Sequence, residues 1–214
     1  MSTGDATARP QRDRAYEALR EALILQQVQE GARLSEPAWA KRLGVGRVAV
    51  REAFARLEAE GLIVRAPTVG YVVPQLDAKD IEEIIDVRLA LEAAAIERAC
   101  AHGQPDPASL APLEEAVEQH AAFVEQGYRL GASEADRRFH HRLVALSGNR
   151  RLVELYRRAP LPLIHRLTMP PGPPSRRPVE EHRRIIEALA AGDARRARRL
   201  LEAHLRTGMQ PRER

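Results

Sequence analysis

The chain has 214 residues, of which 34 are Lys or Arg and 30 are Asp or Glu, so its formal net charge is +4. This length suits one large domain or two small ones, and the charge permits a polyanionic partner without requiring one. Cys100 is the only cysteine, which excludes an intrachain disulfide, and no apolar run approaches the roughly 20 residues that span a bilayer. We therefore expect a cytoplasmic protein without a membrane partner.

Residues 1–10 are small and polar, and we expect them to be disordered. An apolar stripe predicts a helix over 11–27. Ser35 can cap a short helix that begins near Pro37, and Gly44 can turn the chain into the next helix. Trp39 of the short helix is expected in the core.

The stretch 47–64 has apolar residues at helical spacing on one side and two arginines on the other. The apolar stripe consists of Leu43, Val50, Phe54, Leu57, Leu62 and Val64. Arg47 and Arg51 lie one turn apart, so both project from the exposed face. A recognition helix has this form, because its N-terminal residues reach base edges and arginine can bind guanine O6 and N7 together.

Two β-rich runs, 63–64 and 71–73, flank a loop that contains Gly70. This pattern predicts a β-hairpin, which beside a recognition helix would be a wing. Gly70 would let the backbone of the loop approach phosphates or the minor groove. Residues 11–74 are therefore predicted to form a DNA-binding domain of three helices and a hairpin.

The second half of the chain, residues 77–208, has helical patterns and no strand pattern. The predicted helices cover 77–100, 107–126, 132–146, 149–167, 179–190 and 193–207. Asp77 can cap the first of them, whereas Pro160 and Pro162 should kink or break the fourth. We expect an all-α bundle, and hence a mainly α protein.

Four side chains in this half have the spacing of a metal site. Asp136 and His140 lie at i and i+4 and converge on one helix face. His182 and His204 flank a turn at Gly192, each roughly 15–18 Å from it at a rise of about 1.5 Å per residue. Each histidine taken alone is better explained as a surface or hydrogen-bonded residue. Because their depths match, the four together can form a nitrogen and oxygen site suited to Zn²⁺, with Ni²⁺, Mn²⁺ or Fe²⁺ as alternatives.

Two further polar residues have two readings each. Arg88 falls on the apolar stripe of the first bundle helix, and a charge there needs a partner, for which Glu92 is available one turn later. Asn149 lies at a helix start and can be its N-cap. Neither residue needs a ligand to explain it.

Short motifs in the first domain resemble the winged helix-turn-helix of GntR-family bacterial repressors. They are Gly31-Ala-Arg-Leu34, Ala40-Lys-Arg-Leu-Gly-Val45, Arg47-Val-Ala-Val-Arg-Glu-Ala53, Arg56-Leu57-Glu58 and Glu60-Gly-Leu62. Family members usually carry Ser-Arg-Thr-Pro-Val-Arg-Glu-Ala, whereas this chain has Gly46 and Val48 in place of the Ser and the Thr. From the resemblance we expect DNA contacts from Arg33, Arg47, Val48, Arg51, Thr68 and Gly70.

The second half resembles the FCD ligand-binding domain of the FadR subfamily. The matching pieces are Asp86-Val-Arg88 with Glu92, Asp136-x-x-Phe139-His140, Ser147-Gly-Asn149, and Glu181-His182 with Asp193, Ala197 and His204. The resemblance supports the metal site at Asp136, His140, His182 and His204. It also implies that Arg88 binds the carboxylate of an effector beside the metal, and that Asn149 lines the same pocket.

We therefore predict a homodimeric transcriptional regulator, specifically a repressor, that reads an inverted repeat in double-stranded DNA and responds to a small organic acid. Two alternatives remain. One is a metal-dependent hydrolase or lyase, since an Asp and three His with open positions can activate water. The other is a constitutive DNA-binding protein with a purely structural metal. No base can be assigned beside the site and an enzyme would not explain residues 12–73, so we expect no enzymatic activity.

Overall fold

The computed structural model describes residues 10–159 and 172–208, which fall into two compact units, Met1–Gln75 and Leu76–Arg214. Each unit has its own hydrophobic core. The expected disorder at the N-terminus concerns positions that, except for Pro10, lie outside the described residues. No helix in the described part of the chain is both long and apolar enough to cross a membrane.

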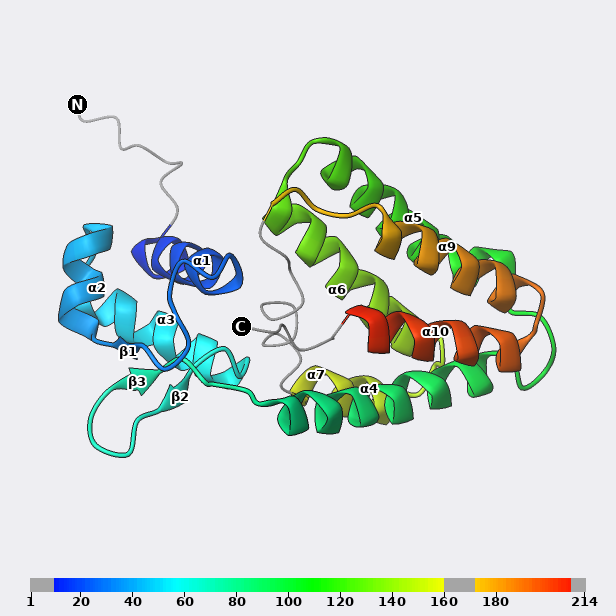
Figure 1. Cartoon of the computed structure of the whole chain (residues 1–214), viewed down its shortest axis with the longest axis horizontal. Coiled ribbons are helices and arrows are strands. Elements are labelled where there is room, and N and C mark those ends of the chain that lie inside the picture. The colour runs from blue at the N-terminus through cyan, green and yellow to red at the C-terminus, as the bar shows by residue number, and fades with distance from the viewer. Residues whose placement is uncertain (1–9, 160–171, 209–214) are drawn as a thin grey trace, which may run out of the picture. The chain divides into compact units, whose positions relative to one another are not determined.

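The described part of the N-terminal unit has three helices and three short strands (Figure 1). In chain order they are α1 (Gln11–Ile24), β1 (Arg33–Leu34), α2 (Glu36–Leu43), α3 (Arg47–Ala59), β2 (Val64–Arg65) and β3 (Tyr71–Val72). Both α1 and α2 pack against α3. The predicted winged helix-turn-helix is confirmed. Helix α1 ends at Ile24 and not at residue 27, and Gln26, just beyond it, has a positive φ of 59°.

Two local features and one contact with α1 accompany the turn from α2 into α3. Ser35 caps α2, because its hydroxyl accepts a hydrogen bond from the Ala38 amide at 3.3 Å. Gly44 ends α2 at φ 62°, in the left-handed region that glycine adopts without a steric penalty. Gly46, the N-cap of α3, has no side chain to cap the helix, and its own amide donates to Oε1 of Gln11 at 3.0 Å. These contacts fix the direction in which α3 leaves the turn.

The three strands form an antiparallel sheet in the order β1–β3–β2. Strands β2 and β3 are the predicted hairpin, with Val64 opposite Val72. Strand β1 was not predicted, because two residues are too few to show the alternation of a strand. The expectation that Val64 lies in the core is wrong, since it is 42% exposed on an edge strand that follows the buried Leu62 and Ile63.

The rear face of α3 provides much of the core of this unit. Phe54 and Leu57 are fully buried there, against residues of α1 that include Leu19. Burying a side chain of this size contributes about 1.5–3 kcal/mol, so the apolar stripe anchors the helix with its other face toward solvent. Trp39 is buried as predicted, and the Arg42 guanidinium lies 4.6 Å from its ring centre.

The described part of the C-terminal unit is entirely helical (Figure 1). Its helices are α4 (Ala78–Ala99), α5 (Pro107–Glu125), α6 (Arg129–Ala145), α7 (Arg150–Arg158), α9 (Arg177–Ala190) and α10 (Ala194–Gly208). Helix α5 packs against α6 and α9, and α10 packs against α9 and α4. The predicted all-α bundle is confirmed, and its core receives side chains from all six of these helices.

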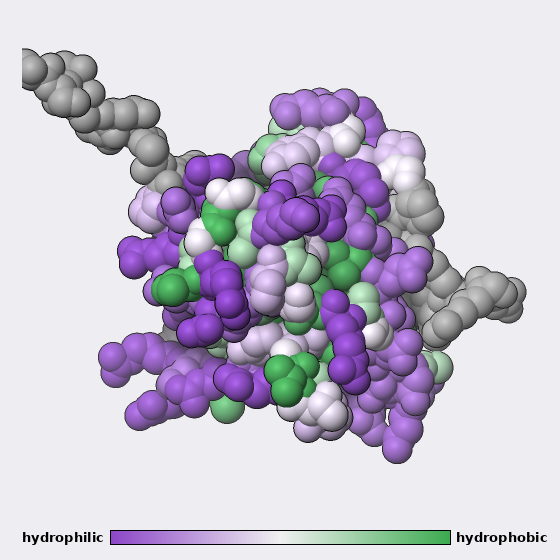
Figure 2. All heavy atoms as spheres, turned by 90° about the vertical axis from the view of Figure 1, so that its left-hand side faces the viewer, coloured by the Kyte–Doolittle hydropathy of each residue, from purple (hydrophilic) through white to green (hydrophobic). Residues whose placement is uncertain are grey.

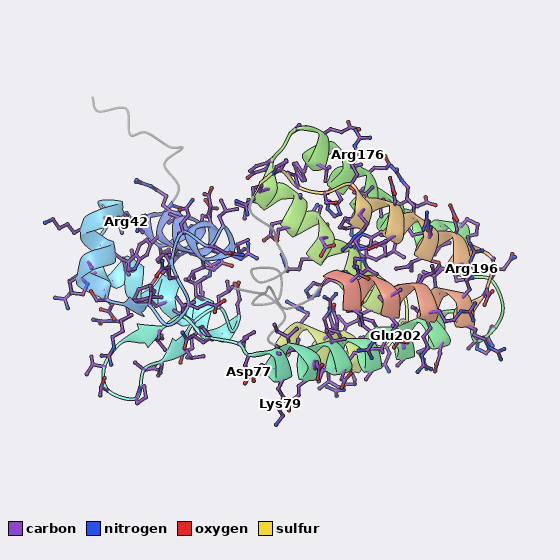
Figure 3. All side chains as sticks on the ribbon, viewed as in Figure 1. Arg42, Asp77, Lys79, Arg176, Arg196 and Glu202 are labelled. Carbon is purple, nitrogen blue, oxygen red and sulfur yellow. The ribbon has the colours of Figure 1, made fainter. Side chains whose placement is uncertain are left out.

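Helix α4 begins after Asp77, which is labelled in Figure 3, and its first turn has a capping box. Oδ1 of Asp77 accepts from the Asp80 amide at 2.8 Å, and Oδ2 of Asp80 accepts from the Asp77 amide at 3.0 Å. Two orphan N–H groups of the first turn are thereby satisfied. The helix then places Arg88 and Glu92, one turn apart, on its buried side.

Helix α7 ends just before the first of the two prolines that were expected to kink or break the fourth bundle helix. It ends at Arg158, and Ala159 has an extended conformation, with φ −66° and ψ 140°. The residue before a proline is pushed out of the helical region by the proline ring, so Pro160 accounts for the end of the helix. Pro162, the expected kink and the remainder of the predicted helix lie outside the described residues.

Candidate metal centre and DNA-binding surface

Three helices bring the four predicted metal ligands together. Asp136 and His140 lie on α6, His182 on α9 and His204 on α10. One potential ligand atom from each residue lies within 4.8 Å of the others. The histidines are almost fully buried, whereas the Asp136 side chain is 18% exposed. The cluster therefore has three imidazoles toward the core and one carboxylate at its more open side.

The imidazole nitrogens of this cluster are unusually close. Nε2 of His204 lies 3.2 Å from Nε2 of His140 and 3.2 Å from Nε2 of His182. The Asp136 carboxylate completes the group, with Oδ1 3.5 Å from His182 Nε2 and Oδ2 3.9 Å from His140 Nε2. Facing nitrogens at this distance need a proton or a cation between their lone pairs.

Burial favours the neutral form of two of these imidazoles, those of His140 and His182. It lowers the pKa of His140 to about 4, although the adjacent Glu92 carboxylate acts in the opposite direction. It also lowers the pKa of His182 well below its ordinary value, and the neighbouring His204 lowers it further. A neutral imidazole is the form that binds a metal ion, so His140 and His182 have the required protonation state near neutral pH.

Two glutamates that were not predicted as site residues contact the outer nitrogens of this cluster. Nδ1 of His140 lies 2.7 Å from Oε2 of Glu92, and Nδ1 of His204 lies 2.7 Å from Oε2 of Glu181. Glu92 had been considered only as an ion-pair partner of Arg88. No sequence spacing signals these contacts, because each joins residues on different helices.

Arg88 and Glu92 do form the ion pair that the spacing allowed. Nε of Arg88 donates to Oε1 of Glu92 at 2.8 Å, and both side chains are buried. Burial alone would raise the pKa of Glu92, but the charge of Arg88, the electrostatic interaction with His140, and hydrogen bonds from His140 and Tyr156 lower it to about 2. Nη2 of Arg88 is nevertheless buried without a hydrogen-bond partner among the described residues. The ion pair therefore leaves part of the guanidinium available.

Asn149 behaves as a helix cap. Its Oδ1 accepts from the Arg151 amide at 3.0 Å and from the Leu152 amide at 3.3 Å, at the start of α7. No hydrogen bond joins it to the four clustered residues within the described part of the chain. His120 was set aside by the sequence reasoning, but it is buried with its ring centre 5.8 Å from that of His182.

The predicted DNA-reading residues are all exposed, but the two arginines differ. Arg47 has no hydrogen bond or ion pair with any residue in 10–159 or 172–208. Arg51 also lies on the exposed face, but its Nε and Nη2 bind the two oxygens of Glu36, with Nη2 3.0 Å from Oε2. The physical reason is that Glu36, at the start of α2, lies across the turn from α3. Val48, beside Arg47, is 65% exposed.

The wing and β1 form the second part of this surface. Nη1 of Arg33, on β1, donates to Oγ1 of Thr68 in the wing loop at 3.4 Å, so two predicted DNA contacts lie together. Gly70 has φ +90°, and a Cβ there would lie 3.2 Å from the Leu34 carbonyl oxygen. Packing within the sheet thus accounts for this glycine. Figure 2 shows a mainly hydrophilic face with small groups of hydrophobic residues among the polar ones.

Comparisons with known proteins match both units. The family model "Bacterial regulatory proteins, gntR family" matches residues 11–73, and the FCD domain matches residues 83–207. The chain belongs to the GntR family. It is therefore a DNA-binding transcriptional regulator with an FCD domain, and not an enzyme.

Relatives of this GntR protein agree with that assignment. The HTH-type transcriptional regulator YdhC of Bacillus subtilis is 30% identical over 193 residues, covering 88% of this chain and 85% of the relative. A probable D-xylose utilization operon transcriptional repressor of Paenarthrobacter nicotinovorans is 32% identical over 82% of this chain and 76% of its own length. The crystal structure of a GntR regulator from Rhodococcus sp. RHA1 matches with a TM-score of 0.71 and 30% identity, covering 92% of this chain and 94% of that one.

Proposed function

We propose that this GntR protein is a homodimeric repressor whose affinity for an inverted-repeat operator depends on a divalent metal ion and a small carboxylate effector. Zn²⁺ is the first candidate, with Ni²⁺, Mn²⁺ and Fe²⁺ as alternatives. The repressor role is consistent with the name of the Paenarthrobacter relative. A regulator of chromosomal genes would act in the cytoplasm.

The observation that carries the metal proposal is the convergence of Asp136, His140, His182 and His204 on one small space. Their donor atoms, three imidazole nitrogens and a carboxylate oxygen, are those that zinc binds. The lone pairs of Nε2 atoms 3.2 Å apart would repel one another unless a proton or a cation lay between them, and a divalent ion can serve all three histidines at once. The residues therefore fit a divalent ion, which would leave coordination positions open for a carboxylate.

The environment of Arg88 supports the proposal of an acidic effector. Its Nη2 is buried and has no partner among the described residues, although its Nε is paired with Glu92. A buried N–H group without an acceptor is destabilising, and a carboxylate oxygen would satisfy it with a charge-assisted bond. Asn149 has its side-chain oxygen engaged as the α7 cap, so in this proposal only its amide nitrogen is available to the effector.

The exposed residues of α3 and the wing support DNA recognition. Arg47 is free to bind a guanine edge, and Arg51 would have to exchange its exposed bond to Glu36 for one to DNA. Val48 has a branched apolar surface that can contact the methyl group of a thymine. We propose backbone or minor-groove contacts for Arg33, Thr68 and Gly70 of the β1–wing surface.

Metal content is the direct test. We expect purified chain loaded with Zn²⁺ to retain one ion per chain after dialysis, and His182→Ala or His204→Ala to lose it while keeping most of the helicity. His102→Ala is the matched control, because His102 is exposed and outside the cluster. An unaltered chain that retains no metal under any loading condition would eliminate the metal site.

A structural metal is the remaining alternative. It predicts that metal stabilises the fold but that no organic acid changes either the thermal stability of the loaded protein or its affinity for DNA. The proposed regulator requires both to change for at least one acid, because a ligand stabilises the state that binds it.

A further inference from the structure

Glu92 is a buried carboxylate at the junction of three helices. It belongs to α4 and is 0% exposed. Its Oε1 accepts from Arg88 Nε at 2.8 Å and from the Tyr156 hydroxyl of α7 at 2.8 Å. Its Oε2 lies 2.7 Å from Nδ1 of His140 on α6. One carboxylate therefore contacts His140 of the cluster, Arg88, whose Nη2 has no partner among the described residues, and Tyr156 of α7.

These bonds determine the protonation of His140. The carboxylate faces the positive charge of Arg88, so it is ionised and can only accept hydrogen bonds. The hydrogen shared with His140 must then be on Nδ1. Nε2 consequently has the lone pair, and it is the atom that lies 3.2 Å from Nε2 of His204. A metal ligand held by a carboxylate in this way has a fixed ring orientation and greater basicity.

The other two histidines are held less firmly. Nδ1 of His204 is 2.7 Å from Glu181, but that carboxylate is 22% exposed and also pairs with Arg177 at 3.3 Å. Nδ1 of His182 is buried without a hydrogen-bond partner among the described residues, and its ring stacks on Phe139 with centres 3.8 Å apart. His140 is thus the histidine whose orientation rests on a fully buried charge.

We propose that Glu92 is the principal positioning residue of the metal site. Its carboxylate holds His140 with Nε2 toward the ion and, through its other oxygen, links that ligand to Arg88. Glu181 has the corresponding role for His204 but contributes less. This inference rests on the proposed metal site. It goes beyond that site by assigning its support to a residue that does not touch the ion.

The test compares zinc affinity, measured by competition with a chromophoric chelator, in the full-length chain. Glu92→Gln should weaken zinc binding by about 10- to 100-fold, the usual effect of losing a carboxylate behind a metal-bound histidine. Glu181→Gln is the matched control, since it removes the other carboxylate without touching Arg88, and it should weaken binding less. Tyr156→Phe removes one donor to Glu92 but keeps its charge and should leave affinity within about threefold.

Glu92→Gln leaves Arg88 buried without a counter-charge and can therefore prevent folding. The double variant Arg88→Met/Glu92→Gln removes that charge and should fold with the same loss of zinc affinity. The tautomers of the unaltered, metal-free chain give a readout that a purely structural role would not produce. Long-range ¹⁵N–¹H correlation spectra should show the hydrogen on Nδ1 of His140 and of His204.

The outcomes separate this inference from the proposed function. A wild-type chain that binds no metal removes both. A wild-type chain that binds zinc, with a folded Glu92→Gln variant within about threefold of its affinity, removes the inference alone. A larger loss in Glu181→Gln than in Glu92→Gln, or a hydrogen on Nε2 of His140 in the metal-free protein, also overturns it.

Discussion

At the scale of single residues, exposure alone does not distinguish the arginines that would read DNA. Arg51 shares its guanidinium with Glu36, whereas Arg47 has no such partner among the described residues. An exposed ion pair contributes only about 0–1 kcal/mol, so DNA can displace it. Arg51 would therefore bind DNA at a net cost that Arg47 does not incur.

We expect Arg47→Ala to lose about 1–3 kcal/mol of discrimination at one guanine in each half-site, because the bidentate contact disappears. The measurement is binding of full-length protein to an operator selected from a random duplex library and to single-base variants of it. Glu36→Ala is the companion variant. It should preserve base preference and strengthen binding overall, since it frees Arg51 and removes a negative charge near the phosphates. Unchanged specificity in Arg47→Ala would contradict its assignment as a base reader.

At the scale of the elements, capping residues define where several of the described helices begin. Ser35, Asp77, Asp106 and Asn149 each accept a backbone N–H at a helix N-terminus. The starts of α2, α4 and α5 agree closely with the sequence predictions, since a cap acts within one turn of the chain. For Asn149 the cap is sufficient to explain the residue, and a contact with effector remains a prediction.

The capping box of α4 gives a stability prediction. Asp77→Ala should destabilise the C-terminal unit by about 1 kcal/mol, because the amide of Asp80 loses its acceptor. Thermal unfolding followed by circular dichroism measures the change. Lys79→Ala is the control in the same turn, as it removes only an exposed pair with Glu83 at 3.6 Å. Equal melting temperatures for the two variants would show that the box contributes nothing.

At the scale of the whole molecule, the proposed regulation requires that ligands in the C-terminal unit change the behaviour of the DNA-binding unit. A ligand can shift a conformational equilibrium only by the difference in its affinity for the two states. The buried group that joins Arg88, Glu92, His140 and Tyr156 links α4, α6 and α7. An acid that binds the metal and Arg88 would act on all three helices together.

We therefore expect an effective organic acid to change operator affinity by roughly 5- to 150-fold, the range of typical allosteric coupling. Removing the metal with a chelator should abolish that response, and Arg88→Lys should reduce it, because lysine lacks a second planar N–H donor. Fluorescence anisotropy of a labelled operator, with and without the acid and the chelator, measures the coupling. A full response in the metal-free protein would place the effector elsewhere.

The sequence alone was enough to identify what depends on spacing along one helix or on short motifs. Local periodicity predicts the helices, the apolar rear of α3 and the Asp136–His140 pair, because side chains three or four positions apart share a helix face. The hairpin follows from two β-rich runs on either side of a loop that contains Gly70. A kink or break in the fourth bundle helix was expected from Pro160 and Pro162, and helix α7 ends at Arg158, with Ala159 extended just before Pro160.

Contacts between elements were decided only by the tertiary structure. The pairing of Arg51 with Glu36, the third strand β1, and the glutamates behind His140 and His204 join residues 15 to 48 positions apart, at distances set by how helices and strands pack. No periodicity encodes such distances, because a small change in packing would move a carboxylate out of hydrogen-bonding range. The residues of the proposed DNA-binding and metal sites can therefore be identified from the sequence. The charged residues that pair with them or orient them can be identified only from the packing of the helices.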